Sequence, residues 1–231
     1  MNNNRLDLVR GSLIGGAVGD ALGYPVEFYS YCEIIDRYGK PGITEYELKR
    51  GVAEISDDTQ MTLFTANGML MGLTRGYMRG IGGAPEFYVQ YAYQDWYNTQ
   101  TMSYEDVMSH EDKLCSRRFT WLSALSELYS RRAPGNTCLT AISRMMKNET
   151  PQNDSKGCGG VMRVAAIPLY AAVDNRMSIT DAARLAGEAA EITHQHPLGF
   201  IPAALMAHII YRLALDEAPN RESFESYIHE G

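Results

Sequence analysis

Cysteine and positive charge are both scarce in this sequence, and each shortage excludes a class of protein. The cysteines form no C-x-x-C pair, which argues against a disulfide framework and a zinc knuckle; they are Cys32, Cys115, Cys138 and Cys158. The 21 lysines and arginines are outnumbered by 28 aspartates and glutamates, which gives a net charge of −7. Because nucleic acids and anionic membranes attract clustered Lys and Arg, we expect no nucleic-acid partner and no membrane partner.

Long hydrophobic runs and strand patterns are missing too. No run of eighteen apolar residues predicts a membrane span, and the apolar stretch 11–26 contains Asp20 and several glycines, unlike the centre of a secretory leader. We therefore expect a soluble, cytoplasmic protein with reduced thiols. No alternating pattern predicts a strand, and no internal repeat or low-complexity segment is present.

Apolar residues at helical spacing dominate instead, and they predict an all-α fold with one domain over residues 1–231. The expected helices cover residues 6–22, 57–73, 85–98, 119–131, 136–147, 161–173, 182–192 and 203–215. Residues 30–54 are expected to form a loop with short helical pieces, and the glycine-rich passage 75–84 a break.

Five residues indicate how individual helices begin or bend. Asn136 is a good N-cap, and Ser178 with Asp181 resembles a capping box. Pro202 suits a first helical turn, whereas Pro168 inside an apolar segment is expected to bend or interrupt its helix.

The tetrapeptide from Ser56 to Thr59 combines two carboxylates, Asp57 and Asp58, with two hydroxyls. Oxygen atoms of these types are the ligands that Mg²⁺ prefers. The same residues are also typical of an ordinary helix start, with Ser56 as N-cap and the aspartates favoured by the helix dipole. The pattern alone leaves both interpretations open.

Acids near the first helix form a second candidate segment. Asp20 lies inside an apolar helix, and Glu27 follows a proline turn. Asp20 favours a structural role, because buried acids usually accept hydrogen bonds from a nearby backbone end. A place at a functional site is the alternative for both.

The third and fourth segments are SKGCGGVMR (155–163) and THQHPLGF (193–200). Closely spaced glycines before a helix let backbone N–H groups approach an anion, although a tight interhelical turn explains them equally well. Two histidines at i and i+2 do not match the i, i+4 spacing of helical zinc sites. A histidine that caps the preceding helix is the simpler interpretation.

Together these segments resemble the ADP-ribosylglycohydrolase family, which includes the dinitrogenase reductase-activating glycohydrolases. The matching strings follow the family order over nearly the whole chain: GSLIGGAVGDALGYPVEF, SDDTQMT, APGNTC, GCGGVMRVAAIPL and ITHQHPLGF. The resemblance implies an all-α orthogonal helical fold, with two Mg²⁺ ions (Mn²⁺ in some members) at the base of a cleft that holds ADP-ribose.

The resemblance also implies roles for individual residues. Ser56, Asp57 and Asp58 fall on the first half of the metal site, and Glu27 falls on an acid near metals and substrate. A carboxylate of Asp57, Asp58 or Glu27 would then take a proton from the attacking water. The residues that fall on the loop around the diphosphate and ribose are Ser155, Gly157, Cys158, Gly159 and Gly160, and His194 falls on a nucleotide contact.

The implied activity is hydrolysis of the glycosidic bond in ADP-ribosylated protein side chains or related ADP-ribosyl compounds. The family's second acidic string, roughly Asp-x-Asp-Thr/Ser, is not found after Phe200. We therefore expect a domain that lacks its closing helices, either as a shortened form or as a divergent member. A catalytically impaired ADP-ribose binder or structural relative is the alternative function, and a helical interaction module is a weaker one. The sequence does not determine the linkage cleaved or the oligomeric state.

Overall fold

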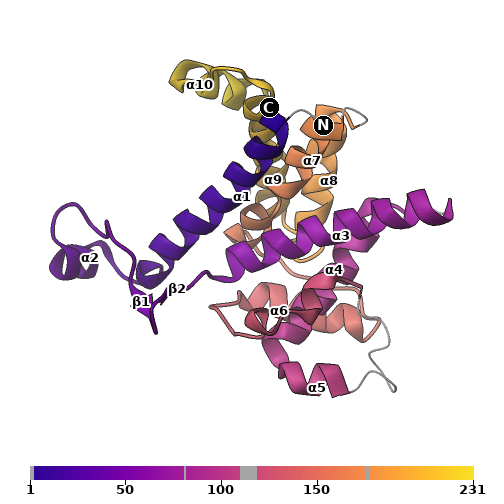
Figure 1. Cartoon of the computed structure of the whole chain (residues 1–231), viewed down its shortest axis with the longest axis horizontal. Coiled ribbons are helices and arrows are strands. Elements are labelled where there is room, and N and C mark those ends of the chain that lie inside the picture. The colour runs from indigo at the N-terminus through magenta and orange to yellow at the C-terminus, as the bar shows by residue number, and fades with distance from the viewer. Residues whose placement is uncertain (1–2, 81, 110–118, 175–176) are drawn as a thin grey trace.

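The computed structural model describes residues 3–80, 82–109, 119–174 and 177–231, so Cys115 lies outside the described residues. The all-α prediction is confirmed: ten α-helices account for most of this part of the chain (Figure 1). They are α1 (Asn3–Gly23), α2 (Tyr31–Tyr38), α3 (Asp57–Arg79), α4 (Pro85–Thr101), α5 (Tyr104–Ser109), α6 (Asn136–Met146), α7 (Ala166–Asp174), α8 (Ile179–Glu191), α9 (Pro197–Leu215) and α10 (Arg221–Glu230).

Short elements connect these helices. Four 3₁₀ turns are present in the described residues: η1 (Tyr24–Val26), η2 (Trp121–Ala124), η3 (Ser126–Leu128) and η4 (Cys158–Arg163). The segment expected as loop also contains a small antiparallel hairpin of β1 (Leu48–Lys49) and β2 (Val52–Ala53). Its strands are two residues long, too short to produce an alternating sequence pattern.

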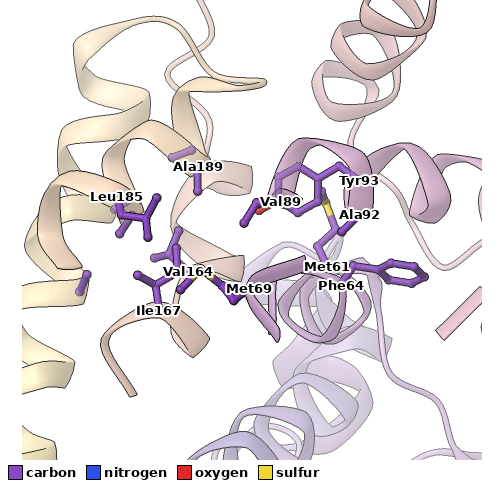
Figure 2. Packing of buried hydrophobic residues seen from close by; sticks show 14 of the residues in the cluster. Met61, Phe64, Met69, Val89, Ala92, Tyr93, Val164, Ile167, Leu185 and Ala189 are labelled. Carbon is purple, nitrogen blue, oxygen red and sulfur yellow. The ribbon is translucent and has the colours of Figure 1, made fainter. Parts of the chain in front are cut away.

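The core lies where α3 and α4 meet α7, α8 and α9. Met61 and Phe64 of α3 and Tyr93 of α4 are fully buried, and Ile167 and Leu185 lie across from them. Figure 2 shows side chains of α3 and α4 on one side of this cluster and those of α7 and α8 on the other. Helical spacing of these apolar residues is what the sequence pattern predicts for a core-facing stripe.

Helix α1 crosses the molecule diagonally from this core towards α2 and the hairpin (Figure 1). Near its start Arg5 donates a hydrogen bond to the carbonyl of Val173, and near its end Asp20 bonds to the beginning of α3. Four glycines lie between these points: Gly11, Gly15, Gly16 and Gly19. A Cβ added at any of them would have no neighbouring atom within 4 Å. The middle of α1 is therefore open on its glycine side.

Helix α9 is long and apolar enough to cross a membrane by length and composition alone, with a mean hydropathy of 1.6. A core helix of a soluble protein passes the same criterion. One face of α9 packs against α7 and α8, where Ala203 and Ala207 are fully buried. Leu198 and Ile201 are exposed on the rest of its surface.

Two helix predictions, the helix at 119–131 and the end of the helix that begins at residue 57, are wrong for different reasons. The segment 119–131 forms η2 and η3 instead of one helix. The Asp95 carboxylate accepts hydrogen bonds from the backbone N–H groups of Phe119 and Thr120 and from the Thr120 hydroxyl, which holds this chain in a turn. In contrast, α3 continues through the expected break and ends at Gly80, whose φ of 64° suits a glycine C-cap.

The proline-containing helices also begin elsewhere than expected. Residues 158–163 form η4, and α7 begins at Ala166, so Pro168 lies in a first turn where no N–H is required. Helix α9 begins at Pro197, with Pro202 inside it. His196 is its N-cap, because Nδ1 accepts a hydrogen bond from the Leu198 N–H at 3.0 Å. The histidine cap thus serves the following helix, not the preceding one.

The remaining helix starts are close to prediction. Ser178 is the N-cap of α8 and accepts from the Asp181 N–H at 3.1 Å, as its sequence signal indicates. Asn136 is the first residue of α6, and Gly135 takes the N-cap position. Helices α2, α5 and α10 were not individually predicted; α10 begins with a capping box of Asn220 and Ser223.

Candidate active site

The beginning of α3 is the best-defined part of the site. Ser56 is the N-cap, and its hydroxyl accepts a hydrogen bond from the Asp58 N–H at 3.1 Å. The Asp20 carboxylate accepts from the N–H of Ser56 at 2.9 Å, from the N–H of Thr59 at 3.2 Å and from the Thr59 hydroxyl. The structural interpretation of Asp20 therefore holds, and Ser56 to Thr59 do form an ordinary helix start.

The two adjacent aspartates face different surroundings, since neighbouring helix residues point about 100° apart. Asp57 is 5% exposed and accepts a hydrogen bond from the Gly135 N–H at 3.2 Å, while its own N–H donates to the Arg132 carbonyl. Burial raises the pKa of Asp57 to about 7. Asp57 thus joins α3 to the turn before α6, whereas Asp58 points towards a cleft.

This cleft has a volume of about 610 Å³ and lies between α1, the first turn of α3 and η4. Its polar lining includes Asp20, Glu27, Ser56, Asp58 and Cys158. The glycine side of α1 forms one wall, so part of the cleft is lined by backbone. The structure therefore brings together Glu27, Ser56, Asp58 and Cys158 from three separate segments of sequence.

The carboxylates in the cleft are crowded. Burial and then the neighbouring charges of Asp58 and Asp20 raise the pKa of Glu27. Burial and then Asp20 raise the pKa of Asp58. Among the described residues, no side chain forms an ion pair or hydrogen bond with the carboxylate of Asp58 or Glu27. An uncompensated anionic pair of this kind is stabilised by a cation.

The donor set fits one hard cation with few protein ligands. Mg²⁺ commonly binds one or two carboxylates and keeps several waters, and Asp58 and Glu27 with the Ser56 hydroxyl offer that chemistry. No group of three or more His, Cys, Asp or Glu residues arranged for a metal is found within the described residues. Two of the acids late in the chain have other partners: Asp216 accepts a hydrogen bond from Tyr227, and Glu230 pairs with Arg212.

The glycine segment 157–160 packs closely against residues 190–199. A Cβ on Gly159 would lie 2.8 Å from Cε1 of His194, and one on Gly160 would lie 2.8 Å from the Gly199 carbonyl oxygen. A side chain would not fit at either position, so packing requires both glycines. This agrees with the interpretation of the segment as a tight turn between helices. Cys158 is exposed and faces the cleft.

Asn153 and Gln195 hold the loop that leads into these glycines, and sequence reasoning did not identify them. The backbone N–H of Asn153 donates to Gln195 Oε1, and its side-chain amide donates to the Thr193 carbonyl, both at 2.9 Å. Asn153 Oδ1 also accepts from the Ser155 N–H at 3.1 Å. An asparagine two residues before a serine is a local turn signal, but its bonds to Thr193 and Gln195 depend on the fold.

His194 lies beneath the glycine segment instead of in the cleft. It is 2% exposed, and its Nδ1 is 2.9 Å from the Thr193 hydroxyl. Burial and the nearby Arg163 lower its pKa to about 4, so the ring is neutral near pH 7. His194 and Gly159 contact each other, while Asp58 and Cys158 line the cleft above them.

Comparison with known protein families identifies one matching family. The family model described as ADP-ribosylglycohydrolase matches residues 1–230, which is nearly the entire chain. No solved structure matches the chain.

Proposed function

Because the chain belongs to the ADP-ribosylglycohydrolase family, we propose that it hydrolyses the glycosidic bond of ADP-ribosylated protein side chains or related ADP-ribosyl compounds. ADP-ribose would be the product. The observation that carries this proposal is the cleft in which Glu27 and Asp58 lie together without a compensating cation among the described residues. Glycosidic hydrolysis requires a carboxylate of this kind close to the anomeric carbon.

Glu27 and Asp58 are the proposed general bases. Their raised pKa values bring them nearer to neutral pH, where a carboxylate removes a proton from water most effectively. Asp57, with its pKa of about 7 and its bond to Gly135, would support the adjacent Asp58 by fixing the first turn of α3. The family resemblance favours Mg²⁺, or Mn²⁺, at Ser56, Asp57 and Asp58; because Asp57 faces Gly135 here, Ser56, Asp58 and Glu27 are the proposed ligands, and the cation would lower the pKa of a bound water.

The segment 155–160 is the proposed binding site for the rest of the ligand. This assignment is supported by Cys158, which lines the same cleft as the carboxylates. Backbone N–H groups at the start of η4 could donate hydrogen bonds to the oxygens of a diphosphate. Binding energy from this remote part of the ligand would orient the bond to be cleaved.

The alternative is a protein that binds ADP-ribose but does not hydrolyse it. One observation favours it: within the described residues, no three His, Cys, Asp or Glu residues form a metal-binding group. Asp216 and Glu230 do not supply the missing carboxylates, because they pair with Tyr227 and Arg212. A single weakly held cation would then aid ligand binding without efficient turnover.

Two measurements distinguish these functions. ADP-ribose with Mg²⁺ should raise the melting temperature of the protein, since a ligand that binds only the folded state stabilises it. Chromatography should then detect ADP-ribose released from arginine-linked and serine-linked substrates, with Asp58→Asn as the inactive variant and Asp36→Asn, at an exposed acid of α2, as the control. Stabilisation without release of ADP-ribose would favour the binding function. If ADP-ribose neither stabilises the protein nor is released from the substrates, both functions are refuted.

We further propose a cytoplasmic location. The described cysteines Cys32, Cys138 and Cys158 are free thiols, which suits a reducing compartment. Substrates carrying ADP-ribose, either protein or small molecule, are the proposed partners. Separation of the protein from cell extracts into cytoplasmic and membrane fractions tests the location directly.

A further inference from the structure

Arg163 is a fully buried cation at the end of η4, beneath the glycine segment. Its guanidinium lies 4.4 Å from the centre of the Tyr93 ring and donates to the carbonyls of Ala189 and Ala190. No carboxylate among the described residues pairs with it, and its Nε has no hydrogen-bond partner there. Burial of a charge is costly unless the group is hydrogen-bonded, so these contacts hold the guanidinium in one fixed position.

Thr193 connects Arg163 to His194. Nη2 of Arg163 donates to the Thr193 hydroxyl oxygen at 2.7 Å, and the same hydroxyl lies 2.9 Å from Nδ1 of His194. A guanidinium only donates, so the Thr193 oxygen must be the acceptor in the first bond. The hydroxyl hydrogen remains available for a second group.

Two acceptors are within reach of that hydrogen, Nδ1 of His194 at 2.9 Å and Sγ of Cys138 at 3.9 Å. The nitrogen is the better acceptor, because sulfur accepts weakly and the distance to Cys138 is long. An N–H at Nδ1 would in addition face the positive charge of Arg163. Nδ1 therefore accepts, and the proton of the neutral ring lies on Nε2.

We propose that Arg163 and Thr193 are positioning residues that hold His194 as a neutral hydrogen-bond donor, with its Nε2–H directed at the glycine segment for an acceptor oxygen of the bound nucleotide. The ligand in this inference rests on the proposed function. Nε2 has no hydrogen-bond partner among the described residues, and it would lie 3.1 Å from a Cβ on Gly159 and 3.7 Å from one on Gly157. The donor thus lies directly against the backbone of the proposed binding segment.

The ring proton can be located without any assay of activity. Protein labelled with ¹⁵N-histidine gives long-range ¹H–¹⁵N correlations that distinguish a protonated from an unprotonated ring nitrogen. The His194 signals are assigned by their absence in His194→Gln. In the wild type at pH 7 we expect Nε2 to be protonated; protonation at Nδ1 would overturn the proposal.

Thr193 offers a matched pair of variants. Thr193→Val keeps the shape but removes the hydroxyl, and we expect it to shift ring protonation towards Nδ1 and weaken ADP-ribose binding about three- to tenfold, the effect of one neutral hydrogen bond. Thr193→Ser should retain both properties. Arg163→Lys keeps the charge but loses the planar fork, and it should behave like Thr193→Val if it folds.

The outcomes separate this inference from the proposed function. An unchanged ring proton in Thr193→Val would refute the positioning role even if ADP-ribose binds normally to the wild type. Absence of ADP-ribose binding by the wild type would refute the proposed ligand, while the ring measurements would still decide between the two protonation states of His194.

Discussion

Asp20 of α1 and Thr59 of α3 are joined by two hydrogen bonds, because one carboxylate oxygen accepts from both the N–H and the hydroxyl of Thr59. The same oxygen accepts from the Ser56 N–H. A side chain of the first helix therefore satisfies N–H groups that the start of another helix leaves unpaired. This contact therefore fixes the end of α1 against the first turn of α3.

Replacing Asp20 by alanine should lower the free energy of unfolding by about 1–3 kcal/mol, because it leaves buried N–H groups without acceptors. Urea unfolding followed by circular dichroism measures this change. Asp7→Ala is the matched control, since Asp7 lies on the same helix with 75% of its side chain exposed. Equal stability of the two variants would contradict the capping role of Asp20.

Mg²⁺ should raise the melting temperature of the wild type but not that of Asp58→Asn. The amide lacks the negative charge that would attract a cation, while its shape is nearly unchanged. The measurement is a thermal melt over a range of Mg²⁺ concentrations, with chelator present at the starting point. Asp36→Asn should respond as the wild type does, and an equal response from Asp58→Asn would place the cation elsewhere.

Gly68→Ala should destabilise the protein by about 1–3 kcal/mol. A Cβ at Gly68 would lie 2.8 Å from the Tyr88 carbonyl oxygen and 2.9 Å from the Cα of Val89, so α3 and α4 would have to move apart. Gly11→Ala is the matched control in α1, where a Cβ meets nothing within 4 Å. That variant should be more stable by about 0.5–1 kcal/mol, because alanine favours the helix. Urea unfolding of both variants measures the change in the free energy of unfolding, which should be negative for Gly68→Ala and positive for Gly11→Ala.

The His194 ring should contribute a loss of stability as the pH is lowered from 6.5 towards 4, whereas Asp57, whose pKa is raised to about 7, acts in the opposite direction over the same range. The pKa of His194 is about 4 in the folded protein against an ordinary value of 6.5, because burial and Arg163 disfavour the charged ring. Between these values the unfolded chain binds a proton that the folded protein does not bind. The contribution is therefore present above pH 6.5 and declines by about 3 kcal/mol across the window.

Unfolding free energies of His194→Gln at several pH values test this expectation. The variant should lose less stability than the wild type between pH 6.5 and 4, since it has no ring to protonate. His229→Gln, at an exposed histidine of α10, should keep the slope of the wild type. A slope for His194→Gln that matches the wild type would mean that other groups cause the acid sensitivity.

Local sequence signals were sufficient where the helix start depends on adjacent residues. Ser178 caps α8 through Asp181, three positions ahead, and the acidic turn at Ser56 begins α3. Long-range hydrogen bonds were not predictable. Asp95 holds residues 119 and 120 in a turn, so a segment with helical spacing becomes two 3₁₀ turns. Only the folded chain brings such groups together.

The candidate site shows the same division. The sequence identified the segments, and the structure places Glu27, Ser56, Asp58 and Cys158 at one cleft. It could not show that Asp57 turns away towards Gly135, because that depends on the direction of a single helix residue. The contacts of Asn153 and Arg163 with residues 189–195 join distant segments and have no local signature.

The glycine-lined middle of α1, anchored near Arg5 and Asp20, has a dynamic consequence. Helical segments with few side contacts open at lower free energy than the core, and their amide hydrogens exchange with solvent sooner. Amides near Gly15 should therefore exchange faster than those of α3, although both helices border the same cleft. The α1 wall of this cleft would then open locally more often than the α3 wall, and such openings would give a bulky ligand a route of entry.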